Sequence, residues 1–191
     1  MELIGTVVRL QVQRSRLKPG PKAMRVYDPT PLREVDALEL GPSGVTGHVG
    51  GEVLLDVHHA DHPDTRFRGV NGLSLLPRHH YDLLRLRFGD HLVDGVAGES
   101  LLLDTEGPWG PDALDGPLVL DTAGGRLELV DGQPAPPCLE FSRFCLGRGP
   151  GGPDDEELAA ALDALDRGVR GFYATPTGPG RVEVGARLLR G

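Results

Sequence analysis

The sequence predicts a β-rich α+β domain in which short strands form a barrel-like sheet. Val- and Leu-rich runs of strand length recur along the chain, and only two segments have a helical pattern. The 28 glycines and 17 prolines among 191 residues separate these runs, which is typical of turns between strands. Many short strands with few helices favour a barrel-like α+β architecture, and we expect residues 1–191 to form a single domain.

The strands are expected wherever apolar residues cluster or alternate with polar ones. The near alternation from Val8 to Gln13 predicts a first strand within residues 3–13. Further strands are predicted within residues 35–40, 52–57, 70–76, 94–104, 118–121 and 126–130. Residues 171–175 and 181–189 are expected to form a closing hairpin around a turn at 177–180. The segments 14–30, 41–51 and 105–117 are interpreted as a long excursion, a turn region and a loop.

Two helices are predicted from their boundary signals. Pro77 and Gly89 bracket residues 78–88, and proline at the start and glycine just past the end are common helix boundaries. The second helix begins near Asp154, where four successive acidic residues occupy the first turn and the helix dipole favours negative charge. Arg167 and Arg170 are interpreted as its end.

The segment 131–147, DGQPAPPCLEFSRFCLG, combines rigidity with chemistry. Three prolines fix backbone angles immediately before Cys138, so its thiol has a defined direction. A thiolate is a nucleophile and a soft metal ligand, and a positive neighbour favours it. Arg143 is the nearby cation and is also suited to binding a phosphate. The alternatives are an inert buried cysteine and a surface ion pair between Arg143 and Glu140.

Two further groups carry candidate chemistry. Glu99 stands between a glycine and a serine and either orients a ligand, acts as a base or is a solvated turn carboxylate. His58, His59 and His62, together with Asp56 and Asp61, have residue types that suit a divalent metal. Adjacent histidines on a strand point in opposite directions, so both bind one ion only where the backbone bends. A polar loop at the barrel mouth is the alternative.

Charge and composition limit the partners. The net charge of −8 argues against a nucleic-acid binder, which needs concentrated basic residues. No apolar run approaches the ~18 residues that span a bilayer, and the N-terminus lacks the apolar core of a signal peptide. Two cysteines are too few for a disulfide framework. We expect a cytoplasmic protein that contacts neither nucleic acid nor membrane and binds a small molecule or cofactor.

Several segments, in order, resemble the MOSC family, the molybdenum-cofactor sulfurase C-terminal domain. No one motif is specific, and the ordered set carries the resemblance, with Ser100 standing where the family usually has asparagine and Ala186 where it often has aspartate. The matching elements are Asp56-Val57-His58-His59, Ser74 with His80-Tyr81-Asp82, Gly98-Glu99-Ser100, Pro137-Cys138, Gly171-Phe172-Tyr173-Ala174 and the segment 180–185.

This resemblance implies a MOSC-like β-barrel that handles sulfur or molybdenum cofactor. Cys138 would carry a persulfide or bind molybdenum, and Gly98, Ser100 and Arg143 would help to hold the cofactor. Some family members reduce N-oxygenated compounds, so a sulfur-donor or redox partner protein is implied, whereas pyridoxal phosphate is not an expected cofactor. The rival functions are a metal-dependent lyase or hydrolase that uses the 58–62 loop, and a non-catalytic barrel that binds a small anion.

Overall fold

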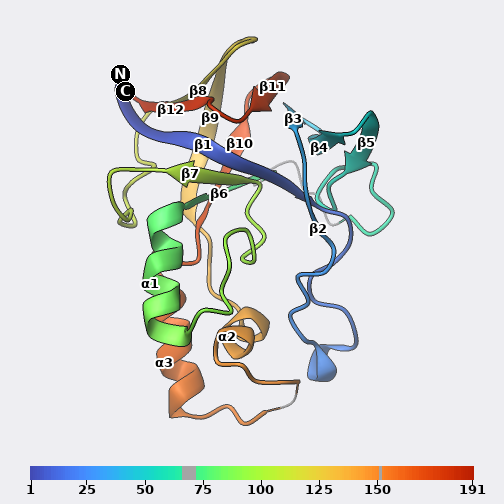
Figure 1. The fold of residues 1–191 in the computed structure, drawn as a ribbon, viewed down its shortest axis with the longest axis vertical. Coiled ribbons are helices and arrows are strands. Elements are labelled where there is room, and N and C mark those ends of the chain that lie inside the picture. The colour runs from blue at the N-terminus through green and yellow to red at the C-terminus, as the bar shows by residue number, and fades with distance from the viewer. Residues whose placement is uncertain (66–71, 151) are drawn as a thin grey trace.

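A computed structural model describes residues 1–65, 72–150 and 152–191 (Figure 1). The strands are β1 (Glu2–Gln13), β2 (Leu32–Glu34), β3 (Ala37–Gly41), β4 (Gly44–Val49), β5 (Glu52–Leu55), β6 (Leu73–Pro77), β7 (Leu101–Asp104), β8 (Leu118–Thr122), β9 (Gly125–Pro134), β10 (Phe172–Pro176), β11 (Gly180–Glu183) and β12 (Arg187–Arg190). The helices are α1 (Arg78–Phe88), α2 (Leu139–Cys145) and α3 (Glu156–Leu165), with a 3₁₀ turn at Lys22–Met24.

Seven strands close into a barrel. Their order is β1, β12, β8, β9, β10, β6 and β7, and β7 pairs back with β1. Among the described strands, only β6 and β7 pair in parallel. Pairing of Glu2 with Arg190 closes the barrel, so the two termini lie side by side (Figure 1). The predicted fold class, a mainly antiparallel β-barrel with peripheral helices, is confirmed.

Two apolar cores stabilise this arrangement. The first fills the barrel and includes the fully buried Leu10, Leu103 and Leu188. The second lies where the three helices gather at one end of the barrel, and it includes Tyr81 and Phe141 (Figure 1). The Cys138 segment enters this second core, so the helices set its position relative to the barrel.

A smaller four-stranded sheet, β11-β3-β4-β5, packs beside the barrel. The prediction of a turn throughout 41–51 is wrong, because β4 occupies Gly44–Val49. Gly47 of β4 allows the two sheets to pack closely. A Cβ atom at Gly47 would lie 2.8 Å from Val35 Cγ1 and 2.9 Å from Val12 Cγ1. Glycine here serves sheet contact, whereas the sequence suggested only turn-forming freedom.

The predicted closing hairpin is also wrong. β10 pairs with β6 and β9, β11 pairs with β3, and β12 pairs with β1 and β8. The last three strands therefore add to different places in the two sheets. Residues 181–189, predicted as one strand, divide into β11 and β12 at a turn around residues 184–185. Long-range pairing, which local turn signals do not show, decides the partner of each strand.

The helix prediction at 78–88 is confirmed. A second helix is present as predicted, but α3 begins at Glu156, where the Asp155 side chain caps it by accepting a hydrogen bond from Leu158 N at 3.0 Å. It ends at Leu165, so Arg167 and Arg170 lie beyond its end. The helix α2 was not predicted from the sequence. Its Phe141 and Cys145 share one buried face. The strand prediction at 70–76 lies partly outside the described residues, and β6 begins at Leu73. Within the described part of the chain, no helix has the length and apolarity to cross a membrane.

Candidate functional site

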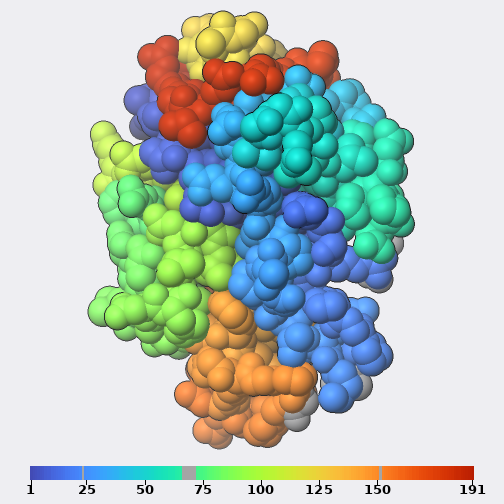
Figure 2. All heavy atoms as spheres, turned by 45° about the vertical axis from the view of Figure 1, so that its right-hand side comes forward, coloured from blue at the N-terminus to red at the C-terminus, as the bar shows by residue number. Residues whose placement is uncertain are grey.

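A cavity of about 520 Å³ lies next to the end of β1. Its walls also include residues of the excursion, the segment 14–30 that follows β1, and of the segments that carry Cys138 and Glu99. Figure 2 shows the excursion, in blue, lying against the α2 region, in orange, at the lower end of the molecule. Tyr27 of the excursion packs edge-on against Phe141 of α2, with ring centroids 4.8 Å apart. The excursion thus forms a wall of the cavity.

Cys138 lines this cavity from the N-cap position, immediately before α2. Its carbonyl accepts hydrogen bonds from Ser142 N at 3.0 Å and Ser142 Oγ at 2.9 Å, which fixes the backbone behind the thiol. The side chain is a free, partly buried thiol. Cys145 is also free but completely buried, and burial raises its pKa to about 12. Of the two thiols, Cys138 is therefore the one placed for chemistry.

The cation at Cys138 is Arg170, which sequence reasoning interpreted as the end of a helix. Its Cζ atom lies 4.3 Å from the centre of the Phe141 ring, and the residue lines the cavity. Among the described residues, the guanidinium has no hydrogen-bond or ion-pair partner. Burial acts to lower the pKa of Arg170, but the nearby phenols of Tyr27 and Tyr173 and the thiol of Cys138 outweigh it and raise the pKa.

Arg143 lies elsewhere, in the wall of a second cavity of about 410 Å³. Its Nη2 atom donates to Gly152 O at 3.0 Å and to Asp154 Oδ1 at 2.7 Å. It pairs with Asp154, two residues before α3, and not with Glu140. α2 turns Arg143 away from the cavity that Cys138 lines, and the two residues are not brought together as the sequence suggested.

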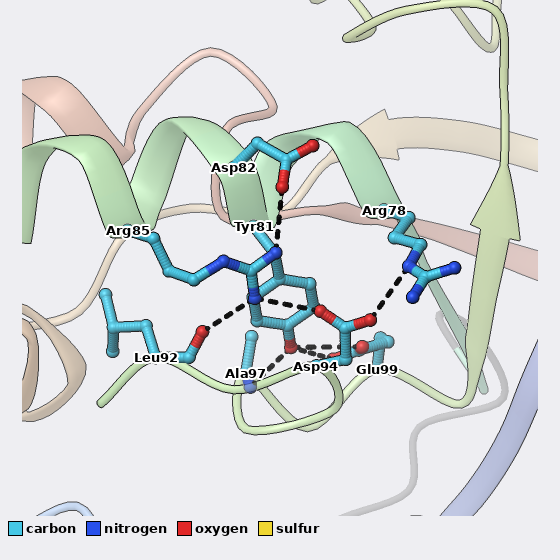
Figure 3. A network of polar contacts seen from close by, with 8 residues as sticks. All are labelled: Arg78, Tyr81, Asp82, Arg85, Leu92, Asp94, Ala97 and Glu99. Carbon is cyan, nitrogen blue, oxygen red and sulfur yellow. Dashed lines mark hydrogen bonds and ion pairs between the residues drawn. The ribbon is translucent and has the colours of Figure 1, made fainter. Parts of the chain in front are cut away.

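Glu99 is a buried carboxyl held by Tyr81 of α1 (Figure 3). The Tyr81 hydroxyl lies 3.0 Å from Glu99 Oε1 and 2.9 Å from Oε2, and it accepts a hydrogen bond from Ala97 N at 2.9 Å. Burial raises the pKa of Glu99 to about 7, against smaller opposing effects of its hydrogen bonds and of Arg170. Glu99 also contributes to the cavity wall, so it is not a solvated turn carboxylate.

α1 fixes the loop that carries Glu99. Arg85 Nη1 binds Asp94 Oδ1 at 2.9 Å and Leu92 O at 3.2 Å, while Arg78 Nε binds Asp94 Oδ2 at 3.0 Å (Figure 3). A helix whose side chains hold both ends of the loop gives the 98–100 segment a defined position.

Gly98 and Ser100 flank Glu99 and line the same cavity. Gly98 has φ +84°, and a Cβ atom there would lie 2.7 Å from Leu17 Cδ1. Its carbonyl accepts a hydrogen bond from Gln13 Nε2 at 2.9 Å. Ser100 Oγ lies 3.2 Å from Ser74 Oγ, so the two serines place their hydroxyls together at the cavity wall.

The three predicted metal-ligand histidines do not converge. His58 lines the cavity, and its Nδ1 lies 2.8 Å from Asp56 Oδ1. His62 uses both ring nitrogens, with Nδ1 accepting from Asp64 N at 3.0 Å and Nε2 lying 3.1 Å from Arg14 O. His59 Nδ1 accepts from Asp61 N at 3.2 Å. Across residues 1–65, 72–150 and 152–191, no group of three or more His, Cys, Asp or Glu is arranged to hold a metal ion.

The excursion supplies cations that sequence reasoning did not single out. Arg16, Lys18 and Arg25 line the cavity with Arg170, and the acidic lining residues are Asp64 and Glu99. Arg16 Nη2 lies 3.7 Å from Asp64 Oδ1. On a chain of net charge −8, this concentration of positive charge distinguishes the cavity and favours an anionic ligand over a cationic one. The available signal was that both lysines of the chain, Lys18 and Lys22, fall in this excursion.

Comparison with known proteins gives the fold. No family model and no curated protein sequence matches the chain. Among solved structures, YuaD from Bacillus subtilis is 14% identical with a TM-score of 0.59, and the match covers 97% of this chain and 94% of that one. YiiM from Geobacillus stearothermophilus is 16% identical with a TM-score of 0.56, over 97% and 74%. YiiM from Escherichia coli is 17% identical with a TM-score of 0.52, over 98% and 68%.

These identities are too low to transfer an activity, and the likeness concerns architecture. YuaD and YiiM are MOSC-domain proteins, so the chain has a MOSC-like fold.

Proposed function

We propose that the protein binds molybdenum cofactor in the 520 Å³ cavity, with the Cys138 thiolate as a ligand or sulfur carrier. The observation that carries the proposal is the joint lining of one cavity by Cys138 and four basic side chains. A soft thiolate and a cluster of cations are the two features that a metal bound to an anionic pterin requires.

The residues present fit this group. A volume of about 520 Å³ is within the usual range of cofactor pockets. Arg170 has an unpaired guanidinium among the described residues, stacks on Phe141 and so has little freedom to lose on binding an anion. Gly98 lets the chain pass close to Leu17 where a side chain would intrude. Hydroxyls of Ser74 and Ser100 add hydrogen-bonding capacity to the wall.

When bound, molybdenum cofactor supplies oxygen-atom and electron transfer. The protein's part is to bind and orient it. Cys138 offers the thiolate from a fixed helix start, while Arg16, Lys18 and Arg25 of the excursion offer charge to the anionic end. Glu99 holds or releases a proton near neutral pH beside the site, because its pKa is raised to about 7.

Loading the purified protein with molybdenum cofactor and measuring bound molybdenum and pterin tests the proposal. Wild type should bind about one equivalent. Arg170→Met should weaken cofactor binding at least tenfold, since it removes a charge from the cavity. Arg143→Met is the matched control, because it removes the same charge outside that cavity, and it should leave the affinity nearly unchanged.

The outcomes separate the two roles of the thiol. A persulfide on Cys138 without pterin, detected by intact-mass spectrometry, would refute cofactor binding and assign the protein to sulfur transfer alone. Neither pterin nor persulfide after reconstitution would refute the proposal.

A further inference from the structure

The loop after β5 carries a histidine whose ring is oriented by a buried carboxylate. Asp56 is 3% exposed. Its Oδ2 accepts a hydrogen bond from Gln13 N at 2.7 Å, and its Oδ1 accepts one from His58 N at 2.9 Å. The His58 ring nitrogen Nδ1 lies 2.8 Å from the same Oδ1. Asp56 thus joins the end of β1 to the loop and to the His58 ring.

These contacts determine which nitrogen of His58 carries the proton in the neutral ring. A carboxylate that already accepts from two backbone N–H groups is an acceptor toward the ring as well, so Nδ1 is the donor. The remaining nitrogen, Nε2, then has a bare lone pair. It has no hydrogen-bond partner among the residues that the structure describes. The side chain is 54% exposed, and the residue lines the cavity that also contains Cys138.

The neighbouring histidines of the same loop have the opposite arrangement. His62 Nδ1 accepts from Asp64 N, so its proton resides on Nε2, which lies 3.1 Å from Arg14 O. His59 Nδ1 likewise accepts, from Asp61 N. Only His58 of these three combines a carboxylate behind the ring with an open Nε2. An imidazole held by a carboxylate at Nδ1 with Nε2 free is the arrangement of a general base.

We propose that Asp56 and His58 form a proton-transfer pair for the Cys138 cavity, in which His58 Nε2 exchanges a proton with an O–H or N–H group of the bound substrate. In the forward step the substrate bond to hydrogen breaks, its electron pair stays on oxygen or nitrogen, and a new N–H bond forms at Nε2. The resulting imidazolium faces the Asp56 carboxylate. The reverse step returns the proton, and no electron is gained or lost by the pair.

The surroundings define the substrate class. Arg16, Lys18 and Arg170 in the same cavity stabilise negative charge. A weak O–H or N–H acid, whose conjugate base is an anion, therefore suits both the base and the cavity. Asp56 is a positioning residue, because it does not line the cavity and acts through the His58 ring. The tautomer of His58 does not depend on the cofactor, whereas proton transfer to a substrate in this cavity rests on the proposed function.

Nitrogen-15 NMR of the histidine side chains tests the arrangement in the protein without cofactor, with the His58 signals assigned by their loss in His58→Gln. At pH 8, His58 should be the Nδ1–H tautomer and His62 the Nε2–H tautomer. In Asp56→Asn the Nδ1–H population of His58 should fall, while that of His62 stays unchanged. If Asp56→Asn does not fold, the wild-type tautomers still decide. An Nε2–H tautomer at His58 in wild type, or zinc bound stoichiometrically at this nitrogen, would overturn the pair.

The proton-transfer role is tested by turnover of the cofactor-loaded protein with an N-oxygenated substrate and a chemical reductant. His58→Gln should lower kcat about 100-fold with little change in KM, because a general acid–base group acts in the transition state. His62→Gln is the control and should retain kcat in the fraction that folds. Equal kcat in His58→Gln and wild type would refute the role. Absence of turnover in wild type would count against the proposed function, while the NMR result still decides on the pair.

Discussion

At the scale of single residues, Glu99 makes the free energy of unfolding depend on pH. Its pKa is raised from 4.5 to about 7, chiefly by burial. The folded protein therefore retains this proton up to about pH 7, whereas the unfolded chain releases it near pH 4.5. The contribution of Glu99 to the free energy of unfolding falls as the pH rises between these values, and above pH 7 the cost of a buried charge is fully present.

Glu99→Gln should remove this pH dependence while keeping an acceptor for Tyr81. The difference in the free energy of unfolding, variant minus wild type, should increase by on the order of 3 kcal/mol from pH 5 to pH 8, as expected from the size of the pKa shift. Urea denaturation at both pH values measures it. A difference between the two proteins that does not change with pH would show that Glu99 titrates normally.

The two cysteines should differ sharply in reactivity. Cys138 lines the cavity, whereas Cys145 is completely buried with a pKa raised to about 12 by burial. Iodoacetamide at pH 8 should alkylate Cys138 in the native protein and reach Cys145 only in urea, because the thiolate is the reactive form. Peptide mass spectrometry identifies the modified residue. Equal labelling of both in the native state would contradict the described packing.

Much of the site was predictable from local sequence, and one part was not. Cys138, Glu99, Gly98 and Ser100 line one cavity, as the family resemblance implied, and His58, which the sequence assigned to a rival metal site, lines it as well. The cation was misplaced, because proximity in sequence pointed to Arg143. α2 directs Arg143 toward Asp154, whereas Arg170, from the segment after α3, lines the cavity with Cys138. This placement depends on tertiary packing, which the spacing of residues in the sequence does not show.

At the scale of elements, the β3–β4 hairpin supports the loop that carries His58. Gly44 begins β4 with φ +111°, and a Cβ atom there would lie 2.8 Å from His59 Cα and 3.1 Å from His58 O. Gly44→Ala should lower the free energy of unfolding by more than about 2 kcal/mol, since backbone strain and a clash with main-chain atoms add. Urea denaturation measures the loss.

Gly50→Ala provides the matched control for that change. Gly50 also has positive φ, +56°, but a Cβ atom there meets nothing within 4 Å. Gly50→Ala should lower the free energy of unfolding by only about 1 kcal/mol, from backbone strain alone. Equal losses of unfolding free energy in Gly44→Ala and Gly50→Ala would mean that Gly44 does not pack closely against the loop that carries His58.

Elements were predictable where periodicity and boundary residues agree, as in α1 between Pro77 and Gly89. They were missed where packing overrides composition. β4 contains two glycines, and its sequence therefore predicts a turn. It is nevertheless a strand, in which the absence of a side chain at Gly47 allows close packing against Val12 and Val35. α2 has only seven residues, too few for a periodic signal, and its stability comes from burying Phe141 and Cys145.

At the scale of the whole molecule, barrel closure joins the first strand to the last. Leu188 of β12 is completely buried between β1 and β8. Leu188→Ala should lower the free energy of unfolding by about 2–5 kcal/mol through the lost contacts and the cavity left behind. Leu86→Ala on α1, where the side chain is 87% exposed, should change it by less than about 0.5 kcal/mol. Similar losses in urea denaturation would contradict closure by β12.

The architecture as a class was predictable from many short strands and two helical patterns, but the closure was not. β12 pairs with β1, although nearly the full length of the chain separates the two strands in sequence. β6 and β7 pair in parallel, and a helix lies between them in the chain. Strand pairing of this kind follows from which apolar faces can be buried together in three dimensions. The sequence shows which residues are apolar, without the pairing register.

The central proposal is that the Cys138 sulfur binds molybdenum in the cavity that Cys138 and four basic side chains line. X-ray absorption at the molybdenum edge tests it most directly, by comparing cofactor-loaded wild type with Cys138→Ser. The account predicts one sulfur ligand fewer in Cys138→Ser, with Cys145→Ser identical to wild type. The same number of sulfur ligands in wild type and Cys138→Ser, or no molybdenum bound by either protein, would contradict it.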